Sequence, residues 1–152
     1  MSCGDPGGAG RIDAQWEDDG GIRVVPVAVR GDLGVPPDLR WDGRALRRLL
    51  KDFRPDLIQV EEEPWSRATA RVASEARRLR IPCVVFTSSS LPRPLTIAER
   101  LRRGRVYKSV AGVIVGNRLA DALVARARPQ LPRAVIPQIG VATPPAPSLA
   151  GG

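Results

Sequence analysis

Apolar residues along the chain follow two spacings in turn, which predicts alternating strands and helices. Short apolar or β-branched runs predict strands at 22–29, 57–61, 83–87, 112–116 and 134–136. Apolar residues three and four apart predict helices that open at Asp42 or Gly43, at Ser66, at Thr96 and at Asn117. This order, with short connections, predicts an α/β, Rossmann-like three-layer domain with a mainly parallel sheet.

The expected ends of the elements rest on local signals. Ser66, Thr96 and Asn117 are residue types that cap helix N-termini, and Pro55 and Pro82 follow the expected ends of two helices. Pro26 places the strand at 22–29 at a sheet edge or breaks it. We divide the chain into an irregular lead-in at 1–21, the domain at 22–142 and a linker-like tail at 143–152, rich in Pro, Ala and Gly.

Polar residues follow four of the predicted strands, where the binding crevice of a parallel sheet lies. They are Glu61, Glu62 and Glu63, then Ser88 and Ser89, then Asn117, then Gln138. Carboxylates, hydroxyls and amides suit a polyhydroxylated ligand, and helix N-termini favour phosphate. Two plainer interpretations stay open: any α/β domain has polar loops there, and the glutamates suit the start of the helix at Ser66.

Charge and composition narrow the classes of function. Net charge is +8, with −4 over residues 1–66 and +12 over residues 67–152, and nearly all the cations are arginine. A phosphate-bearing partner or an anionic membrane surface fits this charge, and so does a composition bias with solvated helix faces. Without histidine, and with only Cys3 and Cys83, we expect no metal site and no Ser-His or Cys-His catalysis.

The sequence lacks the signals of a membrane span, of a secretory signal peptide and of nucleic-acid binding. It has no apolar run of about 20 residues and no basic-plus-apolar start, so we expect a cytoplasmic protein, at most peripheral to the inner membrane face. Aromatic residues are few and no RNA-binding or zinc pattern occurs, so nucleic acid is an unfavoured partner.

Four segments together resemble the N-terminal domain of family-four glycosyltransferases of the GT-B fold. "VIPQIGV" (135–141) resembles the segment that ends that domain, and "LRRLLKDFRPDLIQVEEEP", "ARRLRIPCVVFTSSS" and "SVAGVIVGNRLADALV" resemble earlier segments in the same order. The resemblance covers about Ile22 to Thr143, and order and spacing carry it.

The resemblance implies half of a GT-B enzyme that retains anomeric configuration. The N-terminal domain binds a sugar or lipid-linked acceptor, here through Glu61 to Glu63, Ser88 and Asn117, and arginines near the cleft meet phosphate. A C-terminal domain with an E-x7-E motif binds the nucleotide-sugar donor, so we expect no cofactor on this chain. The family's histidines appear here as glutamates and serines, and only "GDPGGAG" (4–10) stands where a strand, a Gly-rich loop and a helix are expected. We therefore expect a truncated or split hexosyltransferase, inactive alone.

A receiver-like signalling domain is the alternative from another class. "RPDLIQVEEEP" also resembles the segment around the phosphorylated aspartate of response regulators, with Thr87 near their conserved threonine. The chemistry fits less well, because the acceptor aspartate is missing and Lys108 precedes its strand instead of following it. A Rossmann-like binding module without catalytic activity belongs to the same alternative.

Overall fold

The computed structural model describes residues 25, 27, 29–30 and 40–137, and these form an α/β domain with a parallel sheet. This confirms the predicted fold class. The predicted lead-in at 1–21, the tail at 143–152 and Gln138 lie outside the described residues. The strands of the main sheet are β3 (Ile58–Val60), β4 (Cys83–Thr87), β5 (Gly112–Val115) and β6 (Arg133–Val135). The helices are α1 (Gly43–Phe53), α2 (Arg67–Leu79), α3 (Ile97–Ser109) and α4 (Arg118–Ala127).

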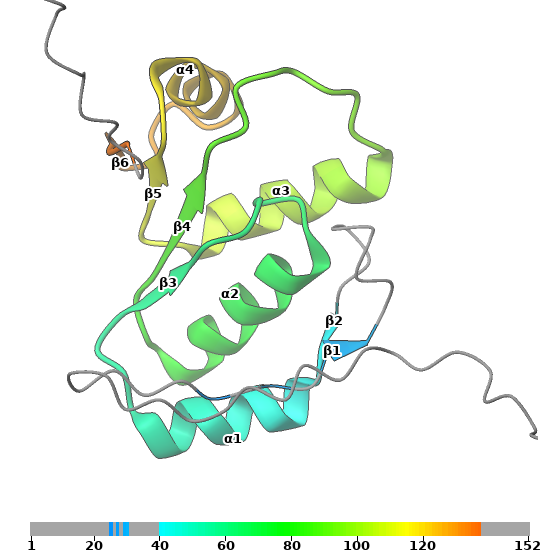
Figure 1. The fold of residues 1–152 in the computed structure, drawn as a ribbon, viewed down its shortest axis with the longest axis vertical. Helices are drawn as coiled ribbons and strands as arrows, with labels where there is room; N and C mark the ends of the chain where they lie inside the picture. Colours follow the sequence, from blue (N-terminus) through cyan, green and yellow to red (C-terminus); the bar gives the residue numbers. More distant parts are fainter. Residues whose placement is uncertain (1–24, 26, 28, 31–39, 138–152) are drawn as a thin grey trace, which may run out of the picture.

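The order of the strands determines where the helices lie. The sheet runs β3-β4-β5-β6, and every neighbouring pair is parallel. The chain advances by one strand in the same direction at each crossover, so right-handed crossovers put α2, α3 and α4 on one face. Figure 1 shows α4 at the top beside β5 and β6, and α1 at the bottom against α2. The described helices thus cover one face of the sheet.

The core lies between this face and the helices. Val85, Val113 and Val115 are 0–2% exposed; Val85 pairs with Val113 across β4 and β5, and Val115 pairs with Thr87. Small residues on α2, Ala73 and Ala76, let that helix approach the sheet closely. Cys83 is a buried core residue, and burial raises the pKa of its thiol to about 11.

The predicted caps Ser66, Thr96 and Asn117 are confirmed, and Asp42 proves to cap the first helix. Asp42, Ser66, Thr96 and Asn117 each accept hydrogen bonds from backbone N–H groups in the first turn of their helix. Thr96 and Glu99 form a reciprocal capping box. Because these side chains satisfy N–H groups that would otherwise lack partners, they fix where each helix begins.

The first predicted strand is the main difference between the sequence pattern and the structure. Val25 and Val27 lie outside any strand, and β1 spans only Val29–Arg30. The rest of the predicted strand at 22–29 is outside the described residues. β1 pairs antiparallel with β2 (Arg40–Trp41), which the pattern does not predict. The physical reason is the short connection: residues 31–39 are fewer than the dozen or so that a parallel crossover requires.

Among the described residues, no helix is both long enough and apolar enough to span a membrane.

Candidate ligand-binding site

The C-terminal edge of the parallel sheet is where the chain places the predicted polar residues. β3 ends two residues before Glu62, β4 ends at Thr87 directly before Ser88, and β5 ends two residues before Asn117. Parallel pairing brings these ends to the same edge. The predicted convergence of the strand ends is therefore present in the structure.

Glu63 is the glutamate that turns inward. Its Oε2 accepts a hydrogen bond of 2.6 Å from the Thr87 hydroxyl, which joins the end of β3 to the end of β4. Burial raises the pKa of the Glu63 carboxyl above its ordinary value, while Thr87 and the backbone N–H groups of Ser89 and Ser88 oppose that rise. Glu63 is therefore a partly desolvated carboxylate, held in place at the sheet edge.

Asn117 links the ends of β4 and β5. Its Oδ1 accepts from the Ala120 N–H at 2.8 Å, and its Nδ2 donates to the Ser88 carbonyl at 3.1 Å. Both ends of the amide are therefore engaged within the chain. The structure gives Asn117 a positioning role, because it fixes the 88–90 segment beside the start of α4.

The other predicted residues lie apart from this arrangement. Glu61 is exposed and its Oε1 accepts from Gln59 Nε2 at 2.5 Å. Glu62 is half-buried, and its carboxylate accepts from the Glu63 N–H. The three consecutive glutamates thus point to different surroundings and do not act as one cluster. Gln138 is outside the described residues.

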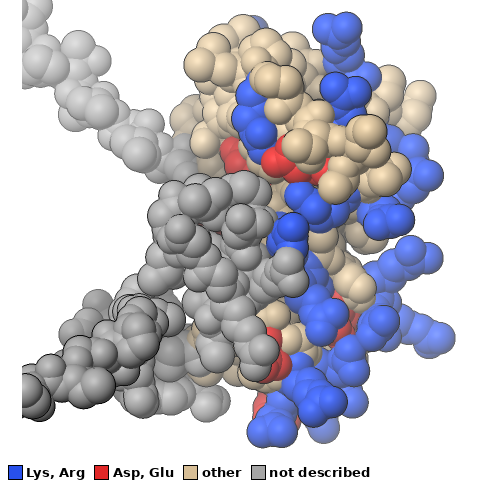
Figure 2. Space-filling view, turned by 90° about the vertical axis from the view of Figure 1, so that its right-hand side faces the viewer, with Lys and Arg blue, Asp and Glu red and all other residues tan. Residues whose placement is uncertain are grey.

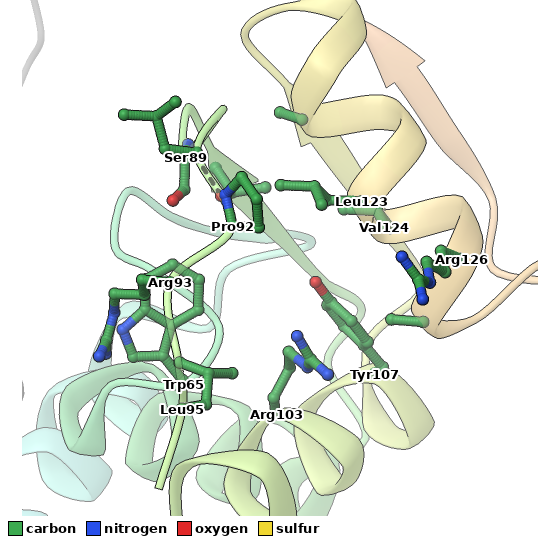
Figure 3. A pocket seen from close by; sticks show the side chains of 14 residues that line it. Trp65, Ser89, Pro92, Arg93, Leu95, Arg103, Tyr107, Leu123, Val124 and Arg126 are labelled. Atoms are coloured by element: carbon green, nitrogen blue, oxygen red, sulfur yellow. Dashed lines mark hydrogen bonds between the residues drawn. The ribbon is translucent and has the colours of Figure 1, made fainter.

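A pocket of about 320 Å³ opens beside Thr87, under the 88–96 connection between β4 and α3 (Figure 3). It is bounded by that connection, by α3, by α4 and by Trp65. Figure 3 shows Ser89 at one end and Tyr107 at the other, with Leu123 and Val124 on the α4 wall. The lining residues are Trp65, Thr87, Ser89, Leu91, Pro92, Arg93, Leu95, Arg103, Tyr107, Ala120, Leu123, Val124, Arg126 and Ala127. An apolar hollow with a few polar groups is typical of a small-molecule site.

One wall of the pocket is held by a chain of contacts through Arg93. Its guanidinium lies over the Trp65 ring, 5.0 Å from the centroid, and its Nη2 contacts Glu99 Oε1 at 2.6 Å. The Arg93 guanidinium and the Thr96 N–H lower the pKa of Glu99 to about 2, so this carboxylate is ionised at neutral pH. The positive charge of Arg93 is thus already compensated.

Sequence reasoning missed most of the pocket. Trp65, Arg93, Arg103, Tyr107 and Arg126 were not among the predicted site residues, although Thr87 and Ser89 follow from the strand-end rule. The missed residues lie on helix faces or in the 88–96 connection. One signal was present in the sequence: Arg103 and Tyr107 are four residues apart and so share a face of their helix.

A second, strongly basic hollow lies between α2 and α3. It measures about 440 Å³ and is lined by Arg67, Arg71, Arg77, Arg102 and Arg105, with Ser74 and Ser109 among the remaining residues. Figure 2 shows Lys and Arg side chains along the full height of the described surface, with few acidic side chains between them. Glu75, the acidic residue of α2, is fully buried; its carboxylate lies 3.7 Å from Nε of Arg71, one of the arginines of the hollow.

No metal-binding arrangement is visible in the part of the chain that the structure describes. There, no three Cys, Asp or Glu side chains gather in a way that could hold an ion.

Comparison with known proteins identifies the family. Residues 3–138 match the family described as "Glycosyl transferase 4-like domain", and this range contains the whole parallel sheet and the candidate pocket. Searches of curated proteins and of solved structures found no match. The match covers most of the sequence and favours the glycosyltransferase interpretation over a receiver-like one. The chain belongs to the glycosyl transferase 4-like family.

Proposed function

We propose that this chain is the acceptor-side, N-terminal portion of a retaining glycosyltransferase of GT-B architecture, and that it transfers no sugar alone. The observation that carries the proposal is the pocket beside Thr87, at the sheet edge where parallel α/β domains bind ligands. Its volume of about 320 Å³ is at the small end for ligand pockets and suits a monosaccharide-sized group.

The residues around the pocket have complementary roles in this proposal. Trp65 offers an aromatic surface for the apolar side of a sugar ring. Ser89 and Thr87 line the pocket, where their hydroxyls can hydrogen-bond to an acceptor hydroxyl, and Glu63 holds the Thr87 hydroxyl in place from behind. Ser88 and Asn117 shape this rim, while Glu61, Glu62 and Gln138 are proposed outer contacts.

Donor binding is assigned to a second domain. The E-x7-E pair that the resemblance places in the donor-binding domain does not occur in this sequence. A partner segment that carries this pair would hold the nucleotide-sugar and complete the cleft. The pocket described here then presents the acceptor hydroxyl to it, and this positioning is the contribution we assign to the chain.

The test compares the chain alone with the chain co-expressed with an adjacent coding segment that contains E-x7-E. With UDP- and GDP-hexoses and a mixture of hydroxyl acceptors, we expect turnover only from the pair, with the anomeric configuration retained by NMR. In the pair, Trp65→Ala should lower kcat/KM for the acceptor by about tenfold or more and leave KM for the donor unchanged.

Phe53→Ala is the matched control, since Phe53 is a 58% exposed aromatic residue on α1, away from the pocket. We expect it to leave both constants unchanged. Turnover by the unpaired chain would contradict the division of labour between two domains. Equal losses in the Trp65 and Phe53 variants would contradict the assignment of the pocket.

We also propose that the basic surface of α2 and α3 rests on an anionic membrane. Arginines line the hollow between the helices, and α3 also carries exposed aliphatic residues: Ile97 is 78% exposed and Leu101 is 55% exposed. Cations bind anionic headgroups, and aliphatic side chains enter the interface below them. Binding to nucleic acid would account for the arginines but not for the exposed aliphatic residues.

Vesicle co-sedimentation checks this proposal with phosphatidylcholine vesicles that contain or lack phosphatidylglycerol. Arg77→Glu with Arg105→Glu should weaken binding to the anionic vesicles by more than about tenfold, since each arginine near the surface contributes about 1 kcal/mol. Arg44→Glu with Arg48→Glu on α1 changes the net charge equally and should have a small effect. Equal losses in the two double variants would show that only net charge matters, and the surface assignment would be wrong.

A further inference from the structure

Tyr107 is a buried side chain whose hydroxyl has no hydrogen-bond partner among the described residues. The residue is only 6% exposed and lies on α3 at one end of the pocket. No buried side-chain nitrogen or oxygen in the described part of the chain is left without a partner, so this hydroxyl must reach open space. Figure 3 shows it pointing into the pocket. The hydroxyl of this buried side chain can therefore donate a hydrogen bond to a ligand bound in the pocket.

Two arginines lie at the same end of the pocket. Arg103 comes from α3 and Arg126 from the last turn of α4, and Figure 3 shows their side chains on either side of the Tyr107 ring. Neither forms an ion pair or a side-chain hydrogen bond with any residue that the structure describes. Arg93, the third arginine of the pocket, differs because Glu99 compensates its charge. Arg103 and Arg126 therefore give this end of the pocket an uncompensated positive charge.

The carboxylate of Glu63 also acts electrostatically on Tyr107. Burial raises the pKa of Tyr107 to about 12, while Arg103 lowers it and Glu63 raises it by smaller amounts, so the phenol remains a donor at neutral pH. Glu63 is engaged by Thr87 at the β4 end of the pocket. The pocket is thus polarised, with a carboxylate behind its β4 end and two guanidinium groups at its α3–α4 end.

Such an end fits a phosphate group better than a neutral hydroxyl. Guanidinium groups bind phosphate oxygens through charge-assisted hydrogen bonds, and a phenolic hydroxyl can donate to a third oxygen. The remaining walls are formed by Trp65, Pro92, Leu123 and Val124, which suit the sugar or polyol part of a ligand.

We propose that Arg103, Arg126 and Tyr107 form a phosphate-binding site and that the ligand of this pocket is a small polyhydroxylated compound carrying a phosphate ester. Resting on the proposed function, this makes the acceptor a sugar or polyol phosphate, with its phosphate at the α3–α4 end and a hydroxyl group toward Ser89. The phosphate can be a soluble monoester or the diester of a lipid-linked acceptor.

Calorimetric titration of the full chain tests the site with four probes: glucose, inorganic phosphate, glucose 6-phosphate and glycerophosphoglycerol. We expect glucose 6-phosphate or the diester to bind at least about tenfold more tightly than glucose. The monoester binding more tightly identifies a soluble ligand, and the diester binding more tightly identifies a lipid headgroup. Absence of any preference for phosphate would overturn the proposal.

Substitutions at the three proposed phosphate ligands test whether the phosphate binds at this end of the pocket. Arg103→Gln and Arg126→Gln should each weaken the binding of the phosphorylated probe by about tenfold, and Tyr107→Phe should weaken it by several-fold. The binding of glucose should stay unchanged. Arg48→Gln replaces an exposed arginine on α1 that lines neither hollow, so it is the control and should change nothing. Phosphate binding that survives both pocket variants would place it elsewhere and overturn the proposal.

Two further readouts keep the result decisive. If a variant fails to fold, the side-chain Nε–Hε NMR signals of Arg103 and Arg126 in the native chain must shift with glucose 6-phosphate and not with glucose. The failure of this proposal also differs from the failure of the proposed function. If the pair transfers sugar to an unphosphorylated acceptor and this transfer depends on Trp65, the proposed function stands and the phosphate site is refuted. If the chain binds phosphate but no pair transfers sugar, the phosphate site stands and the proposed function is refuted.

Discussion

Replacing Glu75 with alanine should lower the free energy of unfolding by roughly 2–3 kcal/mol, because it breaks a buried ion pair between two helices. Glu75 lies on α2 and its side chain has no exposed surface. Arg47 of α1 donates to it twice, from Nε to Oε2 at 2.7 Å and from its Nη2 to Oε1 at 2.9 Å. This bidentate pair joins α1 to α2.

Two neighbouring arginines of α2 add to the charge around this carboxylate. Arg71 Nε lies 3.7 Å and Arg78 Nη1 lies 4.0 Å from Glu75 Oε1. Hydrogen bonding to Arg47 lowers the pKa of Glu75 below its ordinary value, against the opposing effect of burial. Alanine would leave a small cavity and three arginines that repel one another. These arginines are partly exposed, so water compensates some of the loss, and our expected value is below that for a fully buried pair.

Urea denaturation at neutral pH measures the effect. Glu75→Gln keeps the shape and one acceptor oxygen, so we expect about half of the loss. Asp52→Ala removes an exposed carboxylate from α1 and should stay within about 0.5 kcal/mol of the native chain. A Glu75→Ala variant as stable as Asp52→Ala would show that the α1–α2 contact rests on Leu46 and Leu50 alone.

The buried ion pair also shows where sequence patterns stop being informative. The helical spacing of four apolar residues predicts the inward stripe of α2, and they are Ala68, Val72, Ala76 and Leu79. The structure buries the first three and partly buries Leu79. Glu75 lies beside this stripe. From the sequence alone, a charged residue at such a position is expected to face solvent, because its ion-pair partner is not known. The partner is Arg47, 28 residues away on another helix, and no local period reveals that contact.

Local chemistry explains why the helix boundaries were predictable. Caps and prolines act within a few residues, so Ser66, Thr96 and Asn117 fixed the helix starts without any tertiary information. The antiparallel β1–β2 pair was missed because the apolar run at 22–29 carries no information about its partner. Strand pairing depends on contacts between distant residues, and the apolar pattern of one strand does not determine which strand it pairs with.

In the candidate site, too, some residues could be predicted from local rules and others could not. The strand-end rule correctly brought Glu63, Ser88 and Asn117 to one edge, because the rule depends only on topology. It could not decide which of three consecutive glutamates turns inward, since the chain leaves the strand there and bends at Pro64. Nor could it find Tyr107 and Arg126, because their place in the pocket depends on how α3 and α4 rotate against the sheet.

Glu99→Gln should cost about 2 kcal/mol at neutral pH, and this loss should disappear in acid. Glu99 is 5% exposed, completes the capping box with Thr96 and accepts from Arg93, so it anchors both α3 and the 88–96 connection over the pocket. Glutamine keeps the size of the side chain but loses the charge that Arg93 and the N-terminus of the helix favour.

The direction of the pH dependence follows from the lowered pKa of Glu99. The folded chain holds this carboxyl at a pKa of about 2, below its ordinary value near 4.5. Its stabilising contribution is complete above the ordinary value and is lost as pH falls from there toward 2. Glu75 titrates in the same direction and Glu63 in the opposite one, so the native chain alone cannot isolate the effect.

The difference between the native chain and Glu99→Gln does isolate it, because the other carboxyls are common to both. We expect urea midpoints that differ clearly at pH 7, converge through the window between about 4.5 and 2, and coincide at its lower end. The same variant should weaken ligand binding at pH 7, since Arg93 would no longer be fixed over Trp65. A difference in stability that stays constant with pH would mean that glutamine loses packing or shape instead of charge, and the ionic anchor of the pocket wall would be refuted.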